Sequence, residues 1–184
     1  MGHMIGLAAG LLAASLAAQE STWTSGAPYV STPPEVVDRM LALAEVSSGD
    51  IVYDLGCGDG RIVIAAVRTA GVRGVCVEID PSVLKEARAN AERAGVADRI
   101  RFVEGDLFAV PISDATVVTL YLLPLVNRQL RPRLLAELKP GTRVVSHRFD
   151  MGDWKPERTV TVDVKGQQAV VHRWVIPRHP QTTR

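Results

Sequence analysis

The sequence predicts one α/β domain with a seven-stranded, mostly parallel sheet, helices on both faces and a C-terminal antiparallel hairpin. Its 184 residues suit a single domain with a sizeable core. Short apolar runs alternate with segments of helical periodicity, which implies right-handed crossovers between parallel strands. Two further segments of alternating polarity flank Lys165-Gly166-Gln167 and are predicted to form the closing hairpin.

Three helices and three strands are predicted in the first half of the domain. Thr32-Pro33-Pro34-Glu35 combines an N-cap threonine, prolines in the first turn and a capping-box glutamate, so a helix is expected to begin there. Asp80 precedes Pro81 and is predicted to cap a later helix. The other elements of this half are strand 51–55, helix 61–70 ended by Gly71, strand 74–79, a helix from 81 to Gly95, and strand 100–104.

The second half of the domain contains strand patterns at 115–121 and 142–147, followed by the hairpin strands at 158–164 and 169–176. Pro132 lies between the first two of these strands. Because proline lacks an amide proton, it is predicted to break this stretch into a turn or short helix and a following helix at 133–138.

The N-terminal segment differs in composition from the rest. Residues 5–18 are apolar and uncharged, which suits a signal-peptide core better than a membrane span of about 20 residues. Ser15-Leu16-Ala17 has a small-x-small cleavage pattern, but no Lys or Arg precedes the run, and Met1-Gly2-His3 resembles an expression tag. We expect a signal-like, membrane-associating or tag-derived segment with a linker at 1–28, a domain at 29–177 and a tail at 178–184. The alternative is a helix packed on the domain or a disordered segment.

Composition limits the partners of the protein. Apolar residues make up 47% of the chain, and the formal net charge is +1 without a basic cluster, so no nucleic-acid partner is expected. Cys57 and Cys76 fall in predicted core or loop segments, and no Cys/His cluster has ligand spacing. We therefore expect neither a disulfide nor a metal site. We also expect a cytoplasmic monomer, with membrane association or export through 5–18 left open.

A glycine-rich loop follows the first strand and reads Asp54-Leu55-Gly56-Cys57-Gly58-Asp59-Gly60. Alternate glycines permit a tight turn and a close approach of the backbone to a ligand. A dinucleotide fingerprint needs a small residue where this chain has Arg61, so the spacing favours a cofactor without a pyrophosphate. We expect an amino-acid tail along the loop, its ammonium positioned by Asp54, with Asp59 as a second candidate. The alternative is an ordinary strand-to-helix turn.

Carboxylates end the next two predicted strands. Glu78 lies about 20 residues past the loop, where a carboxylate accepts both hydroxyls of an adenosine ribose. Asp106 follows the third strand and is predicted to accept from an adenine amino group, with Ile79 and Leu107 against the ring faces. The alternative role of Asp106 is to form a turn after Gly105. Since strand ends meet at one edge of a parallel sheet, these features predict one adenosine site.

The loop, Glu78 and Asp106 resemble the cofactor motifs of class I S-adenosylmethionine-dependent methyltransferases, which have a Rossmann-like domain. The resemblance covers residues 29–177. More narrowly, the chain resembles the family of the mitochondrial ATP synthase c-subunit lysine methyltransferase and its archaeal and bacterial relatives, although Ser31 stands where that family usually has proline. The segments that carry this resemblance are Pro28-Tyr29-Val30, Thr32-Pro33, the loop with Arg61, Tyr121-Leu122-Leu123-Pro124 and Val145-Ser146-His147.

The resemblance implies S-adenosyl-L-methionine as cofactor, S-adenosyl-L-homocysteine as product and N-methylation of protein lysine by direct in-line transfer. Tyr29 and Tyr121 are the candidate catalytic residues, stacked near the sulfonium or the acceptor ammonium, with ordinary packing as the alternative. The expected cofactor-binding residues are Tyr29, Asp54, Leu55, Gly56, Cys57, Gly58, Asp59, Gly60, Glu78, Ile79, Asp106, Leu107 and Tyr121.

The end of the fourth strand bears on the acceptor. Enzymes that methylate adenine or glutamine amides resemble one another in an Asn/Asp-Pro-Pro-Tyr segment here, whereas this chain begins the segment with Tyr121. An apolar slot suits an aliphatic amine, since desolvation lowers the pKa of a lysine. A small-molecule methyltransferase and a non-catalytic cofactor-binding domain are the alternatives. The expected substrate residues are Leu122, Pro124, Asn127 and His147, where Asn127 either lines the groove or caps a turn, and His147 is either a base or a hydrogen-bonded edge residue.

Overall fold

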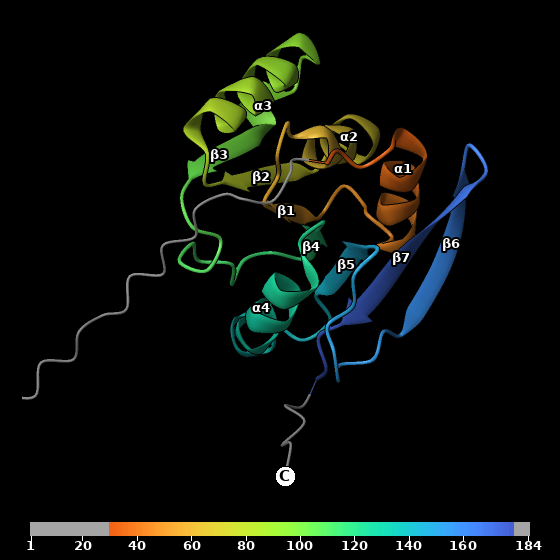
Figure 1. The fold of residues 1–184 in the computed structure, drawn as a ribbon. Coiled ribbons are helices and arrows are strands. Elements are labelled where there is room, and N and C mark those ends of the chain that lie inside the picture. Colours follow the sequence, from red (N-terminus) through yellow and green to blue (C-terminus); the bar gives the residue numbers. More distant parts are fainter. Residues whose placement is uncertain (1–29, 179–184) are drawn as a thin grey trace, which may run out of the picture.

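Seven strands form one sheet in the order β3-β2-β1-β4-β5-β7-β6 (Figure 1). The computed structural model describes residues 30–178; Tyr29, the apolar run at 5–18 with its Ser15–Ala17 pattern, and 179–184 lie outside the described residues. The predicted mixed sheet with a closing hairpin is confirmed. The strands are β1 Ile51–Leu55, β2 Arg73–Glu78, β3 Ile100–Glu104, β4 Val117–Leu120, β5 Arg143–His147, β6 Arg158–Val164 and β7 Gln167–Val175, and the helices are α1 Pro34–Leu43, α2 Arg61–Ala70, α3 Pro81–Arg93 and α4 Pro124–Glu137, with a 3₁₀ turn at Ala97–Arg99.

The direction of strand order reverses between β1 and β4. From β1 the chain moves outward through β2 to β3, and it then returns to β4 on the other side of β1 and continues to β5, all in parallel pairs. Ligands of open α/β sheets bind at the carboxyl ends of the strands beside such a reversal. Strand β7 enters antiparallel between β5 and β6. Its hairpin turns at Lys165 and Gly166, both with positive φ, as a two-residue type I′ turn requires.

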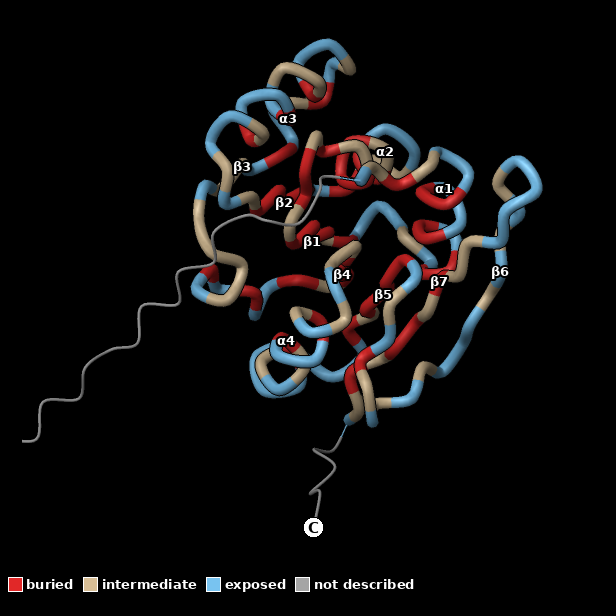
Figure 2. Tube along the Cα trace, in the orientation of Figure 1, coloured by how far each residue is buried: buried red, intermediate tan, exposed pale blue. Residues whose placement is uncertain are grey.

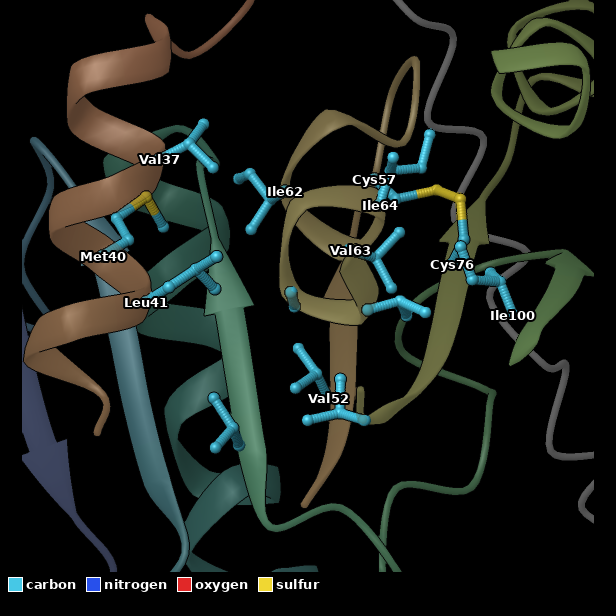
Figure 3. Packing of buried hydrophobic residues seen from close by; sticks show 14 of the residues in the cluster. Val37, Met40, Leu41, Val52, Cys57, Ile62, Val63, Ile64, Cys76 and Ile100 are labelled. Atoms are coloured by element: carbon cyan, nitrogen blue, oxygen red, sulfur yellow. A yellow bond between two sulfur atoms is a disulfide. The ribbon is translucent and has the colours of Figure 1, made fainter. Parts of the chain in front are cut away.

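Helices α1, α2 and α3 cover one face of the sheet, and α4 covers the other. Figure 3 shows Met40 of α1 and Val63 of α2 directed at the sheet, where they join one buried apolar cluster. A second cluster on the opposite face joins Leu130 and Leu134 of α4 to Trp174 of β7. Buried residues are concentrated in the strands and on the helix faces turned toward them (Figure 2). The two-faced core fixes the strand ends that carry the predicted ligand groups.

Two details of the helices differ from the sequence-based expectations. Thr32 does not cap α1: the N-cap is Pro33, which has no side-chain cap, and the Thr32 hydroxyl lies 3.4 Å from Nδ1 of His147. Pro132 does not divide the second stretch, because α4 runs continuously through it. Pro132 and Arg128 are both exposed, so the carbonyl that loses its helical partner stays near solvent, while Leu130 and Leu134 keep the helix packed.

Within residues 30–178, none of the helices has the length and apolar character that crossing a membrane requires.

Candidate active site

The glycine-rich loop turns back over the end of β2. Gly56, Gly58 and Gly60 all have positive φ, between 56° and 78°, where side-chain-bearing residues are strained. The amides of Gly56 and Cys57 both donate to the carbonyl of Val77, at 2.9 and 3.0 Å. Gly60 then precedes α2, and a Cβ there would lie 3.2 Å from that of Ala87. Substitution of these glycines by alanine is therefore expected to disturb the backbone conformation of the loop.

Glu78 points at this loop from the tip of β2. Its Oε2 accepts from the amide of Gly58 at 3.0 Å, and its Oε1 accepts from the amides of Ile79 and Asp80 at 2.9 and 3.1 Å. The side chain is only partly buried. A carboxylate oriented by three backbone donors, with solvent on its remaining side, is placed to accept further hydroxyl donors. The residue closes the space between the loop and β2.

A disulfide joins Cys57 to Cys76 beneath the loop (Figure 3). The expectation of no disulfide is wrong. The turn between Gly56 and Gly58 directs the Cys57 side chain into the core, where only 6% of the residue is exposed, and Cys76 on β2 faces the same side. Cys57 thus contributes its backbone to the loop surface and its sulfur to a covalent tie between the loop and the sheet.

Asp54 lies buried behind the loop. Its Oδ1 accepts from the hydroxyl of Thr119 on β4 at 2.7 Å, whereas its Oδ2 has no hydrogen-bond partner among the described residues. Burial raises the pKa of this carboxyl to about 7, although the Thr119 hydroxyl acts in the opposite direction. The backbone amide of Val63, in the first turn of α2, also acts to lower this pKa, and the unsatisfied Oδ2 is a candidate acceptor for a donor on a ligand.

Asp59, the second candidate for the ammonium, is held by Arg61. The guanidinium donates to both carboxylate oxygens, with Nη2 and Oδ2 2.6 Å apart, and its Nη1 donates to the carbonyl of Thr32 at 2.8 Å. The amide group of Asn90 on α3 also donates to the Asp59 carbonyl at 2.9 Å. Because Arg61 already balances the carboxylate of Asp59, Asp54 suits the ammonium better.

The end of β3 forms a turn. Asp106 accepts from the amide of Phe108 at 2.8 Å, so its turn-forming role is present. The preceding Gly105 amide donates to the carbonyl of Glu78 at 3.0 Å, which places the ends of β2 and β3 together. Ile79 is 51% exposed at this edge, and Leu107 is partly buried. Adenine contact by these three residues stays a prediction.

Aromatic side chains gather at the ends of β4 and β5. The rings of Tyr121 and His147 have centroids 4.1 Å apart. His147 is 5% exposed, and burial, reinforced by Arg148, lowers its pKa to about 4. Beyond Tyr121, Leu122 and Pro124 are partly buried, while Leu123 and Leu125 are about half exposed at 51% and 54%. These residues form an apolar region in which the imidazole of His147 is buried against Tyr121 and the side chains of Leu123 and Leu125 are exposed.

Comparisons with known proteins identify the family of this chain. Residues 54–158 match the ANTKMT methyltransferase domain family. A protein-lysine N-methyltransferase of Saccharolobus islandicus is 51% identical over 153 residues, which cover 83% of this chain and 95% of that relative. The chain belongs to this methyltransferase family.

Two further relatives support the assignment. The ATP synthase c-subunit lysine N-methyltransferase of Xenopus laevis is 36% identical, over 71% of this chain and 57% of its own length. A Salinibacter ruber structure, described as an RNA methyltransferase in complex with S-adenosyl-L-homocysteine, is 60% identical with a TM-score of 0.78, over 84% of this chain and 98% of that one. The methyltransferase assignment and the S-adenosylmethionine cofactor are therefore confirmed.

The residues of this methyltransferase fit that cofactor. Glu78 offers a preoriented acceptor for ribose hydroxyls, and Asp54 has an unsatisfied oxygen for which an ammonium is a donor of suitable charge. The loop contributes backbone from glycines, and the Leu122 side chain lies close to it, with Cδ2 2.8 Å from the position that a Cβ on Gly56 would occupy. These groups come from β1 and β2, with exposed Ile79 beside them.

Several residues of the methyltransferase site were not predicted from the sequence. Arg61 was noted only because it is too large for a dinucleotide-binding loop. Its position two residues after Asp59 is a local signal from which the ion pair between them could have been predicted. Asn90 and Phe149 carry no local signal. Asn127, expected to line a groove or cap a turn, is fully buried and its amide nitrogen donates to the hydroxyl of Ser146 and the carbonyl of Phe149, both at 3.1 Å. It braces the chain after β5.

Proposed function

We propose that this methyltransferase transfers a methyl group to the side-chain amine of lysine in protein substrates. The carrying observation is the apolar region at the ends of β4 and β5, where the Tyr121 ring lies against buried His147 and the partly buried Leu122 lies close to Gly56 of the loop. The end of β4 has no amide or carboxylate to grip a planar amine. The activities for which the Saccharolobus and Xenopus relatives are named support the same acceptor.

The slot prepares the acceptor by desolvation. A lysine ammonium that leaves water for apolar surroundings loses part of its hydration, and the pKa of the amine falls toward the working pH. The neutral amine carries the lone pair that attacks a methyl group. His147, with its pKa lowered to about 4, stays neutral and adds no repelling charge. Proton loss to solvent before transfer is therefore sufficient, and no dedicated base is required.

When bound, S-adenosylmethionine supplies an electrophilic methyl on sulfur: the amine lone pair forms the new N–C bond as the C–S bond breaks, and the C–S electron pair leaves on the thioether sulfur. The protein contributes alignment. Glu78 and the loop fix one partner, while Tyr121 and the slot fix the other across the β1–β4 reversal. Such positioning supplies several kcal/mol, up to about 7–11 in favourable systems.

The rim of the slot favours a large acceptor. Leu123 and Leu125 expose about half of their surface at the beginning of α4, adjacent to Tyr121. Exposed apolar side chains next to a site are suited to contact a polypeptide around its target residue. This supports a protein over a small metabolite.

The decisive experiment follows the methyl label. Purified enzyme is incubated with S-adenosylmethionine carrying a labelled methyl group and cell lysate, and protein, RNA and metabolite fractions are then separated and hydrolysed. We expect label in the protein fraction as methyllysine, absent with Glu78→Ala. Label confined to RNA or metabolites would refute the lysine assignment.

We further propose that the enzyme acts as a monomer and contacts membranes through residues 5–18, because that run is apolar and uncharged. Light scattering measures the molar mass in solution and so tests the monomeric state.

Flotation with neutral lipid vesicles, compared between the full chain and a form lacking residues 1–28, tests the membrane contact. Equal flotation of the two forms would contradict it.

A further inference from the structure

The chain leaves β5 through an unusual turn. Arg148 has a φ of +69°, and the amide of Phe149 donates to the carbonyl of His147 at 2.8 Å, two residues back. This pairing with positive φ at the central residue is typical of a γ-turn of the rare, strained form. The Arg148 amide is anchored to Val170 of β7 at 2.7 Å. Strained turns of this kind persist where their surroundings enforce them, often at functional sites.

Asn127 holds this turn by hydrogen bonds from α4, the helix on the other face of the sheet from α1, α2 and α3. The residue is fully buried in α4, and its amide nitrogen donates to the carbonyls of Phe149 at 3.1 Å and Asp150 at 3.4 Å, as well as to the Ser146 hydroxyl. Its Oδ1 has no partner within 30–178. A buried amide committed to two successive backbone carbonyls fixes the path of the chain there.

The consequence of the turn is the position of the Phe149 ring. It lies stacked beside Tyr121, with centroids 6.3 Å apart and planes inclined by 17°. Phe149 is only partly buried, so part of the ring remains available. The guanidinium carbon of Arg148 lies 5.5 Å from the same ring, so the ring already takes part in a cation–π contact.

We propose that Phe149 is a specificity-determining residue that forms the second aromatic wall of the acceptor slot, and that Asn127 is a positioning residue that holds it there. This inference rests on the proposed lysine acceptor. Tyr121 and Phe149 together present aromatic surface to the acceptor, and aromatic surface favours an alkylammonium over an uncharged group of the same shape. The wall therefore selects amines by charge as well as by size.

The direct test is binding to enzyme saturated with S-adenosylhomocysteine. One probe is a short glycine- and alanine-rich peptide with a single trimethyllysine, and the other is the same peptide with the uncharged tert-butyl analogue. For wild type we expect the cationic peptide to bind roughly 3–10-fold more tightly, as cation–π contacts of about 1 kcal/mol predict. Phe149→Leu should remove most of this preference while leaving the affinity for S-adenosylhomocysteine within twofold.

The matched control is Arg148→Gly, which accepts positive φ and removes the neighbouring guanidinium. We expect it to keep the preference for the cationic peptide. An unchanged preference in Phe149→Leu would overturn the inference, and so would its loss in Arg148→Gly with retention in Phe149→Leu, because the charge selection would then not come from the ring.

The positioning role of Asn127 is tested by coupling. Asn127→Asp removes both donors to the turn and should lower kcat/KM for lysine peptides about as much as Phe149→Leu, roughly 10-fold, with little further loss in the double variant. Additive losses would refute the positioning role. If Asn127→Asp fails to fold, the Phe149→Leu measurements still decide the role of the wall.

Failure of the proposed function is distinguishable from failure of this inference. Wild type that labels no lysine refutes the function itself. Wild type that labels lysine while Phe149→Leu matches it in kcat/KM and in peptide preference refutes only the role of Phe149.

Discussion

The two halves of the site are built in different ways. At the ends of β1 and β2, the ligand surface consists of backbone amides and carboxylates within a few residues of each strand end, with Glu78 bonded to Gly58 as the clearest case. At the ends of β4 and β5, the surface consists of aromatic rings, and the chain at Phe149 is held by Asn127 of α4, which lies 22 residues earlier in the sequence. The cofactor half is built from residues close to the strand ends in sequence, whereas the acceptor half depends on a contact between α4 and the chain after β5.

The difference follows from what each half must recognise. The cofactor has a constant shape, so a rigid loop can bind it, and the Cys57–Cys76 disulfide links this loop to β2. The acceptor half instead consists of rings at the ends of β4 and β5, which are not part of that loop. Variants in each half should therefore separate cofactor affinity from acceptor kinetics.

The largest effect is expected for Glu78→Ala. It removes the acceptor for the ribose and the partner of the Gly58 amide, and hydrogen bonds to charged groups contribute about 1.5–3 kcal/mol each. S-adenosylhomocysteine should bind roughly 100-fold or more weakly by calorimetry, as it should for Gly58→Ala. Near-native affinity in both variants would break the assignment of the cofactor half, and Phe149→Leu serves as the control with intact affinity.

Opening the disulfide should cost about 3 kcal/mol of unfolding free energy, since it closes a loop across 19 residues of sequence separation. Chemical denaturation of wild type with and without a dithiol reductant measures this. The Cys57→Ser/Cys76→Ser variant should match the reduced protein and show no response to the reductant. Equal stability of oxidised and reduced wild type would contradict the covalent tie.

Cofactor binding should release a proton from Asp54. Its pKa, raised to about 7 by burial, leaves the free enzyme protonated there at pH 6, and the cofactor ammonium should stabilise the ionised form. Affinity should then rise up to about tenfold per pH unit between pH 5 and 7 and level off above. In the unliganded protein the sign is opposite: protonated Asp54 favours folding at low pH, and that stability is lost as pH rises through 7.

Calorimetry in buffers of different ionisation enthalpy counts the released proton. Asp54→Asn should bind without proton release and with a flat pH profile over the same range. A pH slope that persists in Asp54→Asn would assign the proton to another group.

The smallest effect is expected for Arg148→Gly. Relief of a left-handed backbone conformation should raise the unfolding free energy by about 0.5–1 kcal/mol. Lys165→Gly is the matched control, because Lys165 also has positive φ but lies in the β6–β7 turn. Both variants should melt at higher temperature, and a decrease for Arg148→Gly alone would show that the guanidinium contributes more than the strain costs.

The same division explains which features the sequence could predict. Strand β1, helix α2 and the Asp80 cap follow from local patterns, and the structure confirms them; the cap accepts from the amides of Ser82 and Val83. Glu78 could be placed correctly because the carboxyl ends of parallel strands lie at one edge of the sheet, so a residue at a predicted strand end has a known location in space. These features need no knowledge of which helix packs where.

The missed features require tertiary information. Cys57 was expected to contact the cofactor, and only the path of the turn at Gly56 shows that its sulfur bonds to Cys76. Pro132 has the sequence signature of a helix break, but burial of Leu130 and Leu134 keeps α4 intact. The positive φ of Arg148 occurs at a residue with no preference for it, so no local rule predicts the turn that positions Phe149.

Thr32 forms hydrogen bonds with residues of both halves of the site. Arg61, next to the loop, donates to its carbonyl, and its hydroxyl meets the His147 ring that lies against Tyr121. The stretch before α1 thus contacts both halves of the site. A substitution at Thr32 is therefore expected to change cofactor affinity and acceptor kinetics together, unlike the variants that act on one half alone.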